Sequence, residues 1–385
     1  MAQAPHTSRR AAEIEPFEVM DVLSRAHALE RAGRRVVHME IGEPDFTAPQ
    51  PVVEAGMRAL REGRTAYTAT LGLPQLREAI ASHYASRFAL DVAPERVVVT
   101  AGASGGLLTV MALYVDAGDE VLVPDPGYPG YRHFVRAFEG RARALPVSGT
   151  TDFQPTAAMV RDAWGPRTKA LVLGSPSNPT GTLISKAELG AIAAFIAERG
   201  GVLIVDEIYQ GLVYGSEPVT ALGLPGEVVV VNSFSKYFCM TGWRVGWVVL
   251  PQRAVRGFEK LAQHLFICAP SAAQYAACAA FAPESIAVFE ERRAEFARRR
   301  DFLLPVLRSA GLKLPAEPHG AFYIYADCAT DARRYCMALL EREAVAATPG
   351  VDFGANGTDH CVRFAYTRAM ADLEEAAARL LRFKP

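Results

Sequence analysis

Lys236 ends an apolar run and lies among side chains that suit a phosphate ester. Only six of the 41 Lys and Arg residues are lysines, so a lysine at a strand end is not there by default. Ser233 and Ser235 precede it closely, and Arg244 follows eight residues later. An amine in a dry pocket can lose its proton near neutral pH and attack a carbonyl. Two serines and an arginine suit a phosphate dianion. Together these residues suggest pyridoxal phosphate, although a surface lysine after a core strand fits this segment alone about equally well.

Two other apolar runs end in polar groups. The run 170–173 leads to Asn178, and the run 202–205 leads to Asp206. Alone, Asn178 fits a turn rich in Pro and Gly, and Asp206 fits a helix N-cap. Asn178, Asp206 and Lys236 are spaced 28 and 30 residues apart in order along the chain. Because ligands bind at the carboxyl ends of parallel strands, we expect the three side chains to share a site.

Composition excludes several classes of protein. The formal net charge is -1 and the pI about 6.7, so there is no electrostatic footprint for nucleic acid or an acidic membrane. The arginines of segment 291–300 alternate with carboxylates and predict the solvated face of a helix. Residues 1–10 lack an apolar signal segment, and no run is long enough to span a membrane.

The cysteines predict free thiols in a reducing, cytoplasmic protein. Their spacing contains no C-x-x-C pair and no His/Cys cluster, so we expect neither a disulfide framework nor a metal site. The six are Cys239, Cys268, Cys278, Cys328, Cys336 and Cys361.

The pattern of apolar residues predicts an α/β fold. Residues 1–15 are expected to form a loose arm, followed by a helix over 17–31 and a strand over 35–41. Buried-type strands then alternate with helical stretches, which indicates a mostly parallel sheet covered by helices on both faces. The expected strands cover 97–100, 120–123, 170–173, 202–205, 228–231 and 245–250, and the helices 75–88, 105–115 and 186–198.

The pattern changes after residue 280. A long charged helix over 283–309, short strands over 321–325 and 361–364, and helices over 332–343 and 370–383 predict a smaller α+β domain. We therefore divide the chain into residues 1–45, which join the small domain, a large cofactor-binding domain of residues 46–280, and a small C-terminal domain of residues 281–385.

With these motifs in place, the chain resembles the class I/II aminotransferases of the pyridoxal-phosphate family, with the aspartate-aminotransferase fold (fold type I). The core signature is Ser233-Phe-Ser-Lys236 followed by Thr241-Gly-Trp-Arg244, and the resemblance runs from segment 41–46 to segment 363–367. It implies transfer of an amino group between an L-amino acid and a 2-oxo acid by a ping-pong mechanism with Schiff-base intermediates. Cys239 departs from the usual smaller residue, and we expect it to leave an oxidisable thiol near the site.

The resemblance also implies roles for the catalytic residues. Lys236 holds pyridoxal 5'-phosphate covalently and then moves the proton at the substrate α-carbon. Asp206 faces the pyridine nitrogen, Tyr209 and Asn178 hydrogen-bond the ring phenolate oxygen, and Tyr128 stacks on the ring. The residues expected at the phosphate are Gly102, Ala103 and Ser104 at a helix N-terminus, Ser233, Ser235, Arg244, and Tyr67 from the neighbouring subunit. A homodimer with shared active sites follows from that role of Tyr67.

Arg363 matches the arginine that binds the substrate α-carboxylate in a bidentate pair. Gly42 and Asn178 complete that site, and closure of the small domain expels water. Ser104 stands where one dicarboxylate-specific subgroup has a lysine, and Phe17, Met20 and the stretch 128–131 offer an apolar wall. These features favour a neutral or aromatic amino acid paired with a common 2-oxo acid such as 2-oxoglutarate, and leave an aspartate enzyme open.

Two alternatives remain open from the sequence. A pyridoxal-phosphate β-lyase or cyclopropane-carboxylate-synthase-like enzyme would keep every residue named here and differ in its substrate pocket. A non-enzymatic regulator built on an aminotransferase-like domain would carry an added DNA-binding module, for which there is no room before Ile41.

Overall fold

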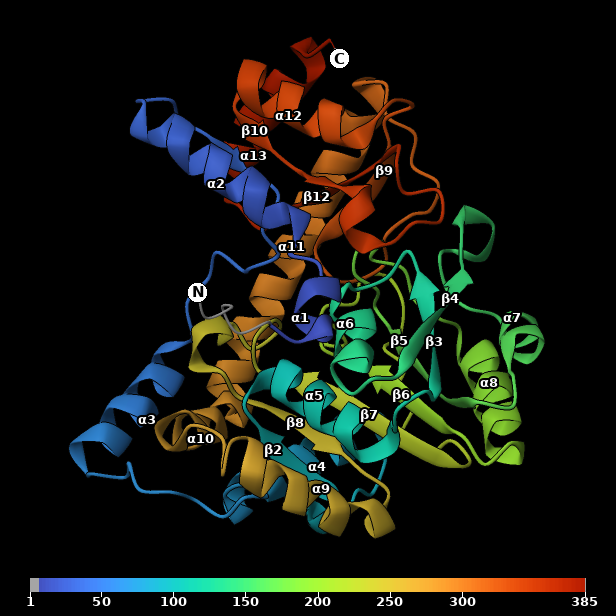
Figure 1. Ribbon diagram of the computed structural model, residues 1–385. Helices are drawn as coiled ribbons and strands as arrows, with labels where there is room; N and C mark the ends of the chain where they lie inside the picture. Colours follow the sequence, from blue (N-terminus) through green and yellow to red (C-terminus); the bar gives the residue numbers. More distant parts are fainter. Residues whose placement is uncertain (1–6, 385) are drawn as a thin grey trace, which may run out of the picture.

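A mixed seven-stranded sheet forms the centre of the larger part of the protein (Figure 1). The computed structural model describes residues 7–384. The strand order is β2-β8-β7-β6-β5-β3-β4. Strands β4, β3, β5, β6 and β7 run parallel, and β8 is antiparallel to both of its neighbours. The predicted mostly parallel sheet is confirmed.

Side chains of the buried strands alternate between two apolar cores, one on each face. In β5, Ala170 and Val172 pack on the same side as helices α5, α6 and α9. Leu171 and Leu173 point to the other side, where α4, α7, α8 and α10 lie. A strand that is buried on both faces reads as a continuous apolar run, because successive side chains point in opposite directions.

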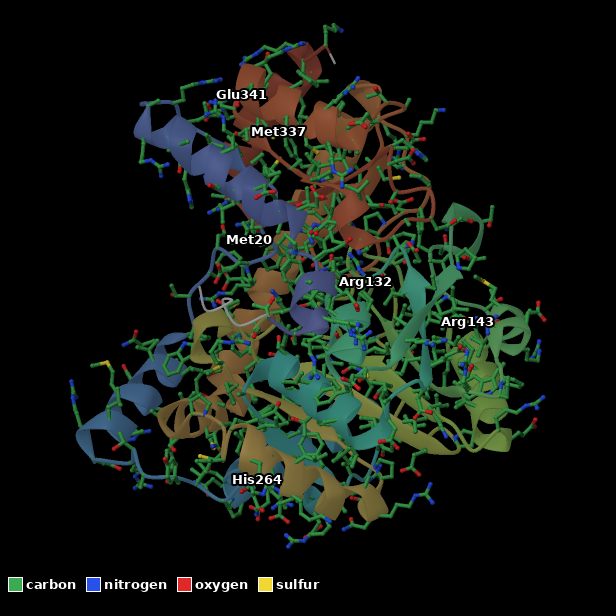
Figure 2. All side chains as sticks on the ribbon, in the orientation of Figure 1. Met20, Arg132, Arg143, His264, Met337 and Glu341 are labelled. Atoms are coloured by element: carbon green, nitrogen blue, oxygen red, sulfur yellow. The ribbon has the colours of Figure 1, made fainter. Side chains whose placement is uncertain are left out.

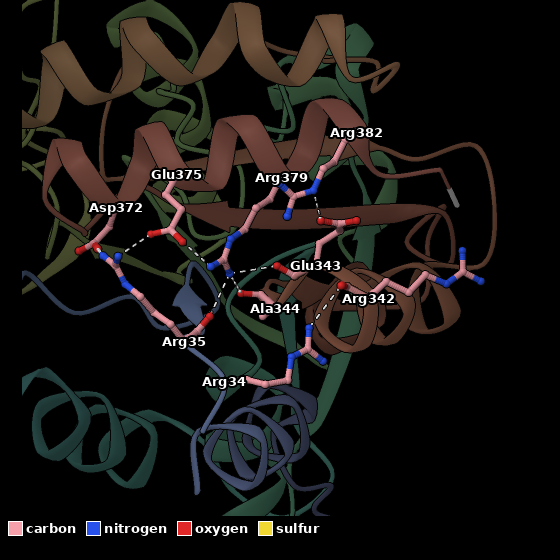
Figure 3. A network of polar contacts seen from close by, with 9 residues as sticks. All are labelled: Arg34, Arg35, Arg342, Glu343, Ala344, Asp372, Glu375, Arg379 and Arg382. Atoms are coloured by element: carbon pink, nitrogen blue, oxygen red, sulfur yellow. Dashed lines mark hydrogen bonds and ion pairs between the residues drawn. The ribbon is translucent and has the colours of Figure 1, made fainter. Parts of the chain in front are cut away.

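The smaller part lies beyond the carboxyl ends of the parallel strands (Figure 1). Its antiparallel sheet has the order β11-β12-β9, and β1 pairs with β10 in a two-stranded parallel sheet. The 27-residue helix α11 contacts α3 at one end of the molecule and α13 in the smaller part. Figure 3 shows Arg379 and Arg382 of α13 bonded to the end of α12 and to the main chain at Arg35.

Strands β1 and β4 differ from the prediction. The strand expected over 35–41 is only Val37–His38 (β1), because the next carbonyl oxygens accept hydrogen bonds mostly from side chains instead of a neighbouring strand. Strand β4, Arg141–Pro146, was not predicted. It is an edge strand with mostly exposed side chains, so it has no apolar run.

The predicted loose arm was wrong for residues 9–13, which form helix α1, while residues 1–6 lie outside the described part. Ion pairs hold this segment against the end of α6 and the turn that follows it: Glu13 pairs with Arg136 of α6, and Arg10 pairs with Glu139 at 3.1 Å. Figure 2 shows Arg132 on α6 close to this segment, where it lies 3.8 Å from Glu15. These long-range charge pairs leave no local periodic signal.

Among residues 7–384, no helix is long and apolar enough to cross a membrane. The α-helices are α1 Arg9–Glu13, α2 Glu18–Arg31, α3 Gln50–Arg61, α4 Pro74–Phe88, α5 Gly102–Tyr114, α6 Gly130–Ala137, α7 Ala157–Ala163, α8 Lys186–Glu198, α9 Gln252–Leu265, α10 Ser271–Cys278, α11 Pro283–Ser309, α12 Ala332–Glu343 and α13 Met370–Arg382. The strands are β1 Val37–His38, β2 Val97–Thr100, β3 Glu120–Asp125, β4 Arg141–Pro146, β5 Thr168–Gly174, β6 Val202–Asp206, β7 Glu227–Ser233, β8 Gly246–Val249, β9 Tyr323–Asp327, β10 Val345–Ala346, β11 Thr348–Pro349 and β12 Cys361–Ala365.

Candidate active site

A cavity of about 400 Å³ lies where the parallel strands end and the smaller part begins. The predicted residues that line it are Gly42, Ala103, Ser104, Tyr128, Asn178, Asp206, Tyr209, Ser235, Lys236, Arg244 and Arg363. The topology therefore brings side chains from the ends of β5, β6 and β7 together with an arginine of β12.

Lys236 is the amine of this cavity. Its Nζ donates a hydrogen bond to the carbonyl oxygen of Gly42 at 2.6 Å. Burial lowers the pKa of Lys236 to about 8; Arg363 and Arg244 act in the same direction, and Glu43 opposes them. About a tenth of this amine is therefore uncharged at pH 7, far more than for an ordinary lysine, and the uncharged form is the one that a nucleophile or a general base requires.

Asp206 ends β6 and is held by two donors. The backbone N–H of Ile208 donates to Oδ1 at 3.2 Å, and the hydroxyl of Tyr131 donates to Oδ2 at 2.9 Å. Burial raises the pKa of Asp206 to about 6, and both hydrogen bonds pull it down. Sequence reasoning did not assign Tyr131 to Asp206. The sequence offered one signal for this role: Tyr131 follows Tyr128 by three residues near the start of a helix, so both side chains can lie on the same side.

Aromatic rings form the cavity walls beside this amine and carboxylate. The hydroxyl groups of Tyr209 and Tyr323 are hydrogen-bonded at 2.8 Å. The ring of Tyr128 lies edge-on to Tyr131 at 5.2 Å between centroids and stacks with Phe17 at 6.4 Å. Tyr323 was not predicted as a site residue, because it comes from β9 of the smaller part and no local pattern ties it to the cavity.

The donors predicted for a phosphate gather at one end of the cavity. Arg244 Nη1 lies 3.4 Å from Ser235 Oγ, and Ser233 donates from behind to Ser235 at 2.9 Å. A Cβ on Gly102 would lie 2.4 Å from Arg244 Nη2, so only glycine lets this guanidinium approach the N-terminus of α5. Ser233 and Gly102 therefore support the lining instead of forming it.

Arg363 is buried, with 5% of its surface exposed, in the middle of β12. Nη1 donates to Asn178 Oδ1 at 2.9 Å, and Nη2 donates to the carbonyl oxygen of Glu40 and to Thr348 Oγ1 at 3.2 Å. The guanidinium carbon lies 4.4 Å from the ring centroid of Tyr323. Nε is buried and has no hydrogen-bond partner among the described residues. A buried donor without a partner is costly, and a ligand carboxylate would satisfy it.

Besides Ser233 and Gly102, the predicted residues Tyr67, Cys239 and Met20 also lie outside the lining. Tyr67 is 78% exposed, between α3 and α4. Cys239 is buried beside a separate surface hollow, and burial raises the pKa of its thiol. The cysteine therefore has little thiolate at neutral pH and is less open to oxidation than expected.

The donor set fits pyridoxal phosphate. An aldehyde needs an amine that can lose its proton, a pyridine nitrogen needs a buried carboxylate, and a phosphate needs hydroxyl, guanidinium and helix N-terminal donors. Lys236, Asp206, and Ser235 with Arg244 at the start of α5 supply these three groups around one cavity.

Comparison with known proteins agrees with this chemistry. The model of the family described as aminotransferase class I and II matches residues 34–380. The chain belongs to the class I and II aminotransferases. This is a family of pyridoxal-phosphate-dependent transferases, and the predicted fold and enzyme class are thereby confirmed.

Relatives of this aminotransferase have several different names. It is 40% identical over 374 residues, 96% of each chain, to "Valine--pyruvate aminotransferase" of Mycobacterium tuberculosis. It is 38% identical, over 98% of its own length and 99% of the relative's, to "(5-formylfuran-3-yl)methyl phosphate transaminase" of Methanocaldococcus jannaschii. A solved aspartate aminotransferase of Thermus thermophilus has a TM-score of 0.93 at 35% identity, covering 98% of this chain and 100% of that one.

Proposed function

We propose that this aminotransferase binds pyridoxal 5'-phosphate in the cavity and transfers amino groups from neutral or aromatic L-amino acids to a 2-oxo acid. One observation carries the proposal: the amine of Lys236, the carboxylate of Asp206 and the guanidinium of Arg363, whose Nε has no partner among the described residues, line the same cavity. When bound, the cofactor supplies an electron sink that makes the α-hydrogen of the substrate acidic.

Each polar residue has a separate task in this proposal. Lys236 would hold the cofactor through its amine, and the free Nζ would then take and return the proton at the substrate α-carbon. Asp206 keeps a proton on the cofactor ring nitrogen by its charge, and Tyr131 keeps Asp206 in place. Tyr209 and Asn178 would hold the cofactor ring by hydrogen bonds, and Tyr128 would pack against it.

The phosphate is held by charge and by helix polarity. We assign it to Ser104, Ser235 and Arg244, with the amides of Gly102 and Ala103 at the N-terminus of α5. Ser233 orients Ser235 through the bond between their hydroxyl groups.

The substrate carboxylate is bound by Arg363, with Gly42 and Asn178 beside it. A planar guanidinium gives two parallel charge-assisted hydrogen bonds, which fix the orientation of the α-carbon next to Lys236. We propose that residues 281–385, joined by residues 1–45, move against residues 46–280 and exclude water during the reaction.

Three features support a substrate with a neutral side chain. The lining near the N-terminal segment contains Phe17, Val19 and Phe353, which are apolar. The carboxylate of Asp352 lines the same wall. The cations among the described lining residues are Lys236, Arg244 and Arg363, each of which has another task in this proposal. The aminotransferase from Mycobacterium tuberculosis named for valine and pyruvate is a relative whose name agrees with this choice.

We further propose a cytoplasmic homodimer with shared sites. Tyr67 is exposed, as are Met57 and Leu60 of α3, and exposed apolar side chains suit a contact with a second copy. In such a dimer Tyr67 extends to the phosphate of the neighbouring subunit.

A panel of half-reactions tests this function. The purified enzyme is mixed with single amino acids, and the absorbance of the cofactor is followed before and after addition of 2-oxoglutarate. We expect a reversible loss of the absorbance band, with L-aspartate at least about tenfold less efficient in kcat/KM than L-valine or L-phenylalanine. Release of ammonia and pyruvate would identify a lyase, and the absence of any change would identify a protein without catalysis.

A further inference from the structure

His38 lies between two carboxylates behind the Arg363 site. Its Nδ1 is 2.7 Å from Oε1 of Glu40, and its Nε2 is 3.1 Å from Oε1 of Glu30. A neutral imidazole has one N–H donor, whereas the charged ring has two. With both carboxyl groups ionised, both contacts are hydrogen bonds only when His38 carries two protons, so the geometry suits a charged ring.

Glu40 is the partner that most needs this charge. It is 0% exposed, and its second carboxylate oxygen, Oε2, has no hydrogen-bond partner among the described residues. A buried carboxylate is costly unless it is paired, and removing one member of a buried pair costs more than the pair contributes. Glu30 is much more exposed, with 41% of its side chain accessible, and can turn to solvent.

The main chain next to Glu40 connects this pair to the catalytic cavity. The carbonyl oxygen of Glu40 accepts hydrogen bonds from Arg363 Nη2 and Thr348 Oγ1. Two residues later, the carbonyl oxygen of Gly42 accepts from Lys236. The residue that carries the buried carboxylate therefore also holds the guanidinium assigned to the substrate.

Other charged groups around His38 are already paired or remote. From α2, the ring of His27 lies 6.0 Å from the ring of His38 between centroids. Arg368, just before α13, donates from Nε to the main-chain oxygen of His38 at 3.1 Å. In α13, Arg379 bonds Glu375 (Figure 3). Arg35, next to β1, pairs with Asp372 and Glu375, and the residues of β10 are the uncharged Val345 and Ala346.

We propose that the His38–Glu40 pair positions Arg363, and that the proton on His38 couples binding of the substrate carboxylate to pH. This inference rests on the proposed role of Arg363. When His38 is charged, it balances the negative charge of the Glu40 side chain, and the main-chain carbonyl oxygen of Glu40 stays in place to accept the hydrogen bond from Arg363. When His38 loses its proton, the buried carboxylate lacks a counter-charge, and any movement that relieves it displaces the carbonyl oxygen that holds the guanidinium.

The direction of the effect follows from the contacts. The hydrogen bond to Glu40 raises the pKa of His38, although burial opposes this. A raised pKa in the folded protein means that the contribution of the pair is complete below the ordinary histidine value. It is lost as the pH rises through the raised value. The affinity for the substrate carboxylate therefore falls on the alkaline side.

The test uses 2-aminoisobutyrate, an amino acid that has a carboxylate but no α-hydrogen. Its binding to the holoenzyme is read by absorbance between about pH 6 and pH 9, around the histidine range. Across the His38 transition, we expect the wild-type Kd to rise about three- to tenfold more than that of His38→Asn, which keeps a donor but does not titrate. Glu40→Gln should likewise lose this pH-dependent rise in Kd, because it has no buried carboxylate that could be left without a counter-charge.

A matched control is His360→Asn. His360 also contacts a carboxylate, Asp359 at 3.0 Å, but that carboxylate is 82% exposed. In this variant, the Kd for 2-aminoisobutyrate should rise with pH as it does in the wild type. In the wild-type protein, NMR titration of the His38 ring should show a higher pKa with 2-aminoisobutyrate bound than without it, because the linkage is reciprocal.

The outcomes separate the inference from the proposed function. The coupling is refuted if the Kd of His38→Asn rises with pH as steeply as that of the wild type. It is also refuted if 2-aminoisobutyrate leaves the titration of His38 unchanged in the wild-type protein, a measurement that does not depend on the folding of a variant. If Arg363→Lys binds 2-aminoisobutyrate as tightly as the wild type, the carboxylate assignment fails and the inference fails with it. Weak binding by Arg363→Lys together with an unchanged step in His38→Asn refutes the inference alone.

Discussion

Lys236 and Arg363 line the same cavity but are held by two different kinds of structure. Lys236 follows β7, which lies between β6 and β8 in a continuous sheet. Arg363 is held by Asn178 from the larger part and by Glu40 from the segment after β1, in addition to its own small sheet. The sheet positions Lys236 by regular pairing, whereas Arg363 depends on segments that are far apart in the chain. We therefore expect substitution of Lys236 to affect only the chemistry of that residue, whereas substitutions around Arg363 should also disturb the segments that contact it.

The largest effect is expected at Lys236. Lys236→Ala should still bind the cofactor through the phosphate site but lose transamination by about four orders of magnitude or more, because the covalent anchor and the base vanish together. Single-turnover absorbance with a good amino-acid substrate measures the loss. Lys260→Ala, at an exposed lysine of α9, should react like the wild type. Borohydride reduction followed by peptide mapping should label Lys236, and label on another lysine would contradict the assignment.

The next effect is expected at Arg363. Arg363→Lys keeps the charge but loses the planar donor pair, which should cost roughly 2–4 kcal/mol, or about 30- to 1,000-fold in kcat/KM. The loss should be similar for amino acids with different side chains, because all of them share the α-carboxylate. Steady-state kinetics on a substrate panel measure it, with Arg298→Lys at an exposed ion pair as control. A loss confined to acidic substrates would show that Arg363 contacts the side chain instead.

A smaller effect is expected from Tyr131→Phe, which tests the support of Asp206 at the end of β6 in the large sheet. The variant removes the hydrogen bond to Asp206 at 2.9 Å. Loss of a bond to a charged group should cost roughly 1.5–3 kcal/mol. That bond lowers the pKa of Asp206 against the effect of burial. Without it the pKa rises above about 6, so activity should be lost at a higher pH as the solution is acidified.

The pH profile of kcat/KM measures this shift. Tyr114→Phe is a matched control, because Tyr114 also contacts a carboxylate, Glu227 at 3.4 Å, but lies away from the cavity. An acid limb that does not move in Tyr131→Phe would show that Tyr131 does not act through Asp206.

The smallest effect is expected at Tyr67. Tyr67→Phe should weaken retention of the cofactor by roughly 1 kcal/mol, or about fivefold, if its hydroxyl bonds the phosphate of the neighbouring subunit. Equilibrium dialysis measures the affinity. Hybrids of Tyr67→Phe and Lys236→Ala subunits should regain activity, because one of their two sites carries neither change. A fully active monomer in sedimentation would rule out a shared site.

The same contrast explains what the sequence could predict. The strand ends at Asn178, Asp206 and Lys236 follow apolar runs, so their convergence at one sheet edge follows from periodicity and topology. Arg363 could be assigned only through the family resemblance, since a lone arginine in a strand has no local signature. The roles of Tyr131 and Tyr323 were missed because each depends on a contact with a residue more than 70 positions away.

Elements at the edges were also hard to predict. Strand β4 has exposed side chains and pairs only with β3, so its sequence shows no apolar run. Helix α1 is five residues long and is held by charge pairs to α6. Such elements are stabilised by distant partners, and propensity within the segment is too weak to reveal them.

The segment from His38 to Gly42 presents five successive carbonyl oxygens, each of which has a fixed partner. Those partners are Arg368, Ala365, Arg363 with Thr348, Thr367 and Lys236. Substituting a side chain such as Ile41 leaves these oxygens in place. Inserting or deleting one residue would shift them by one position and mismatch all of the partners at once. The length of this stretch is therefore constrained more tightly than the identity of a side chain such as that of Ile41.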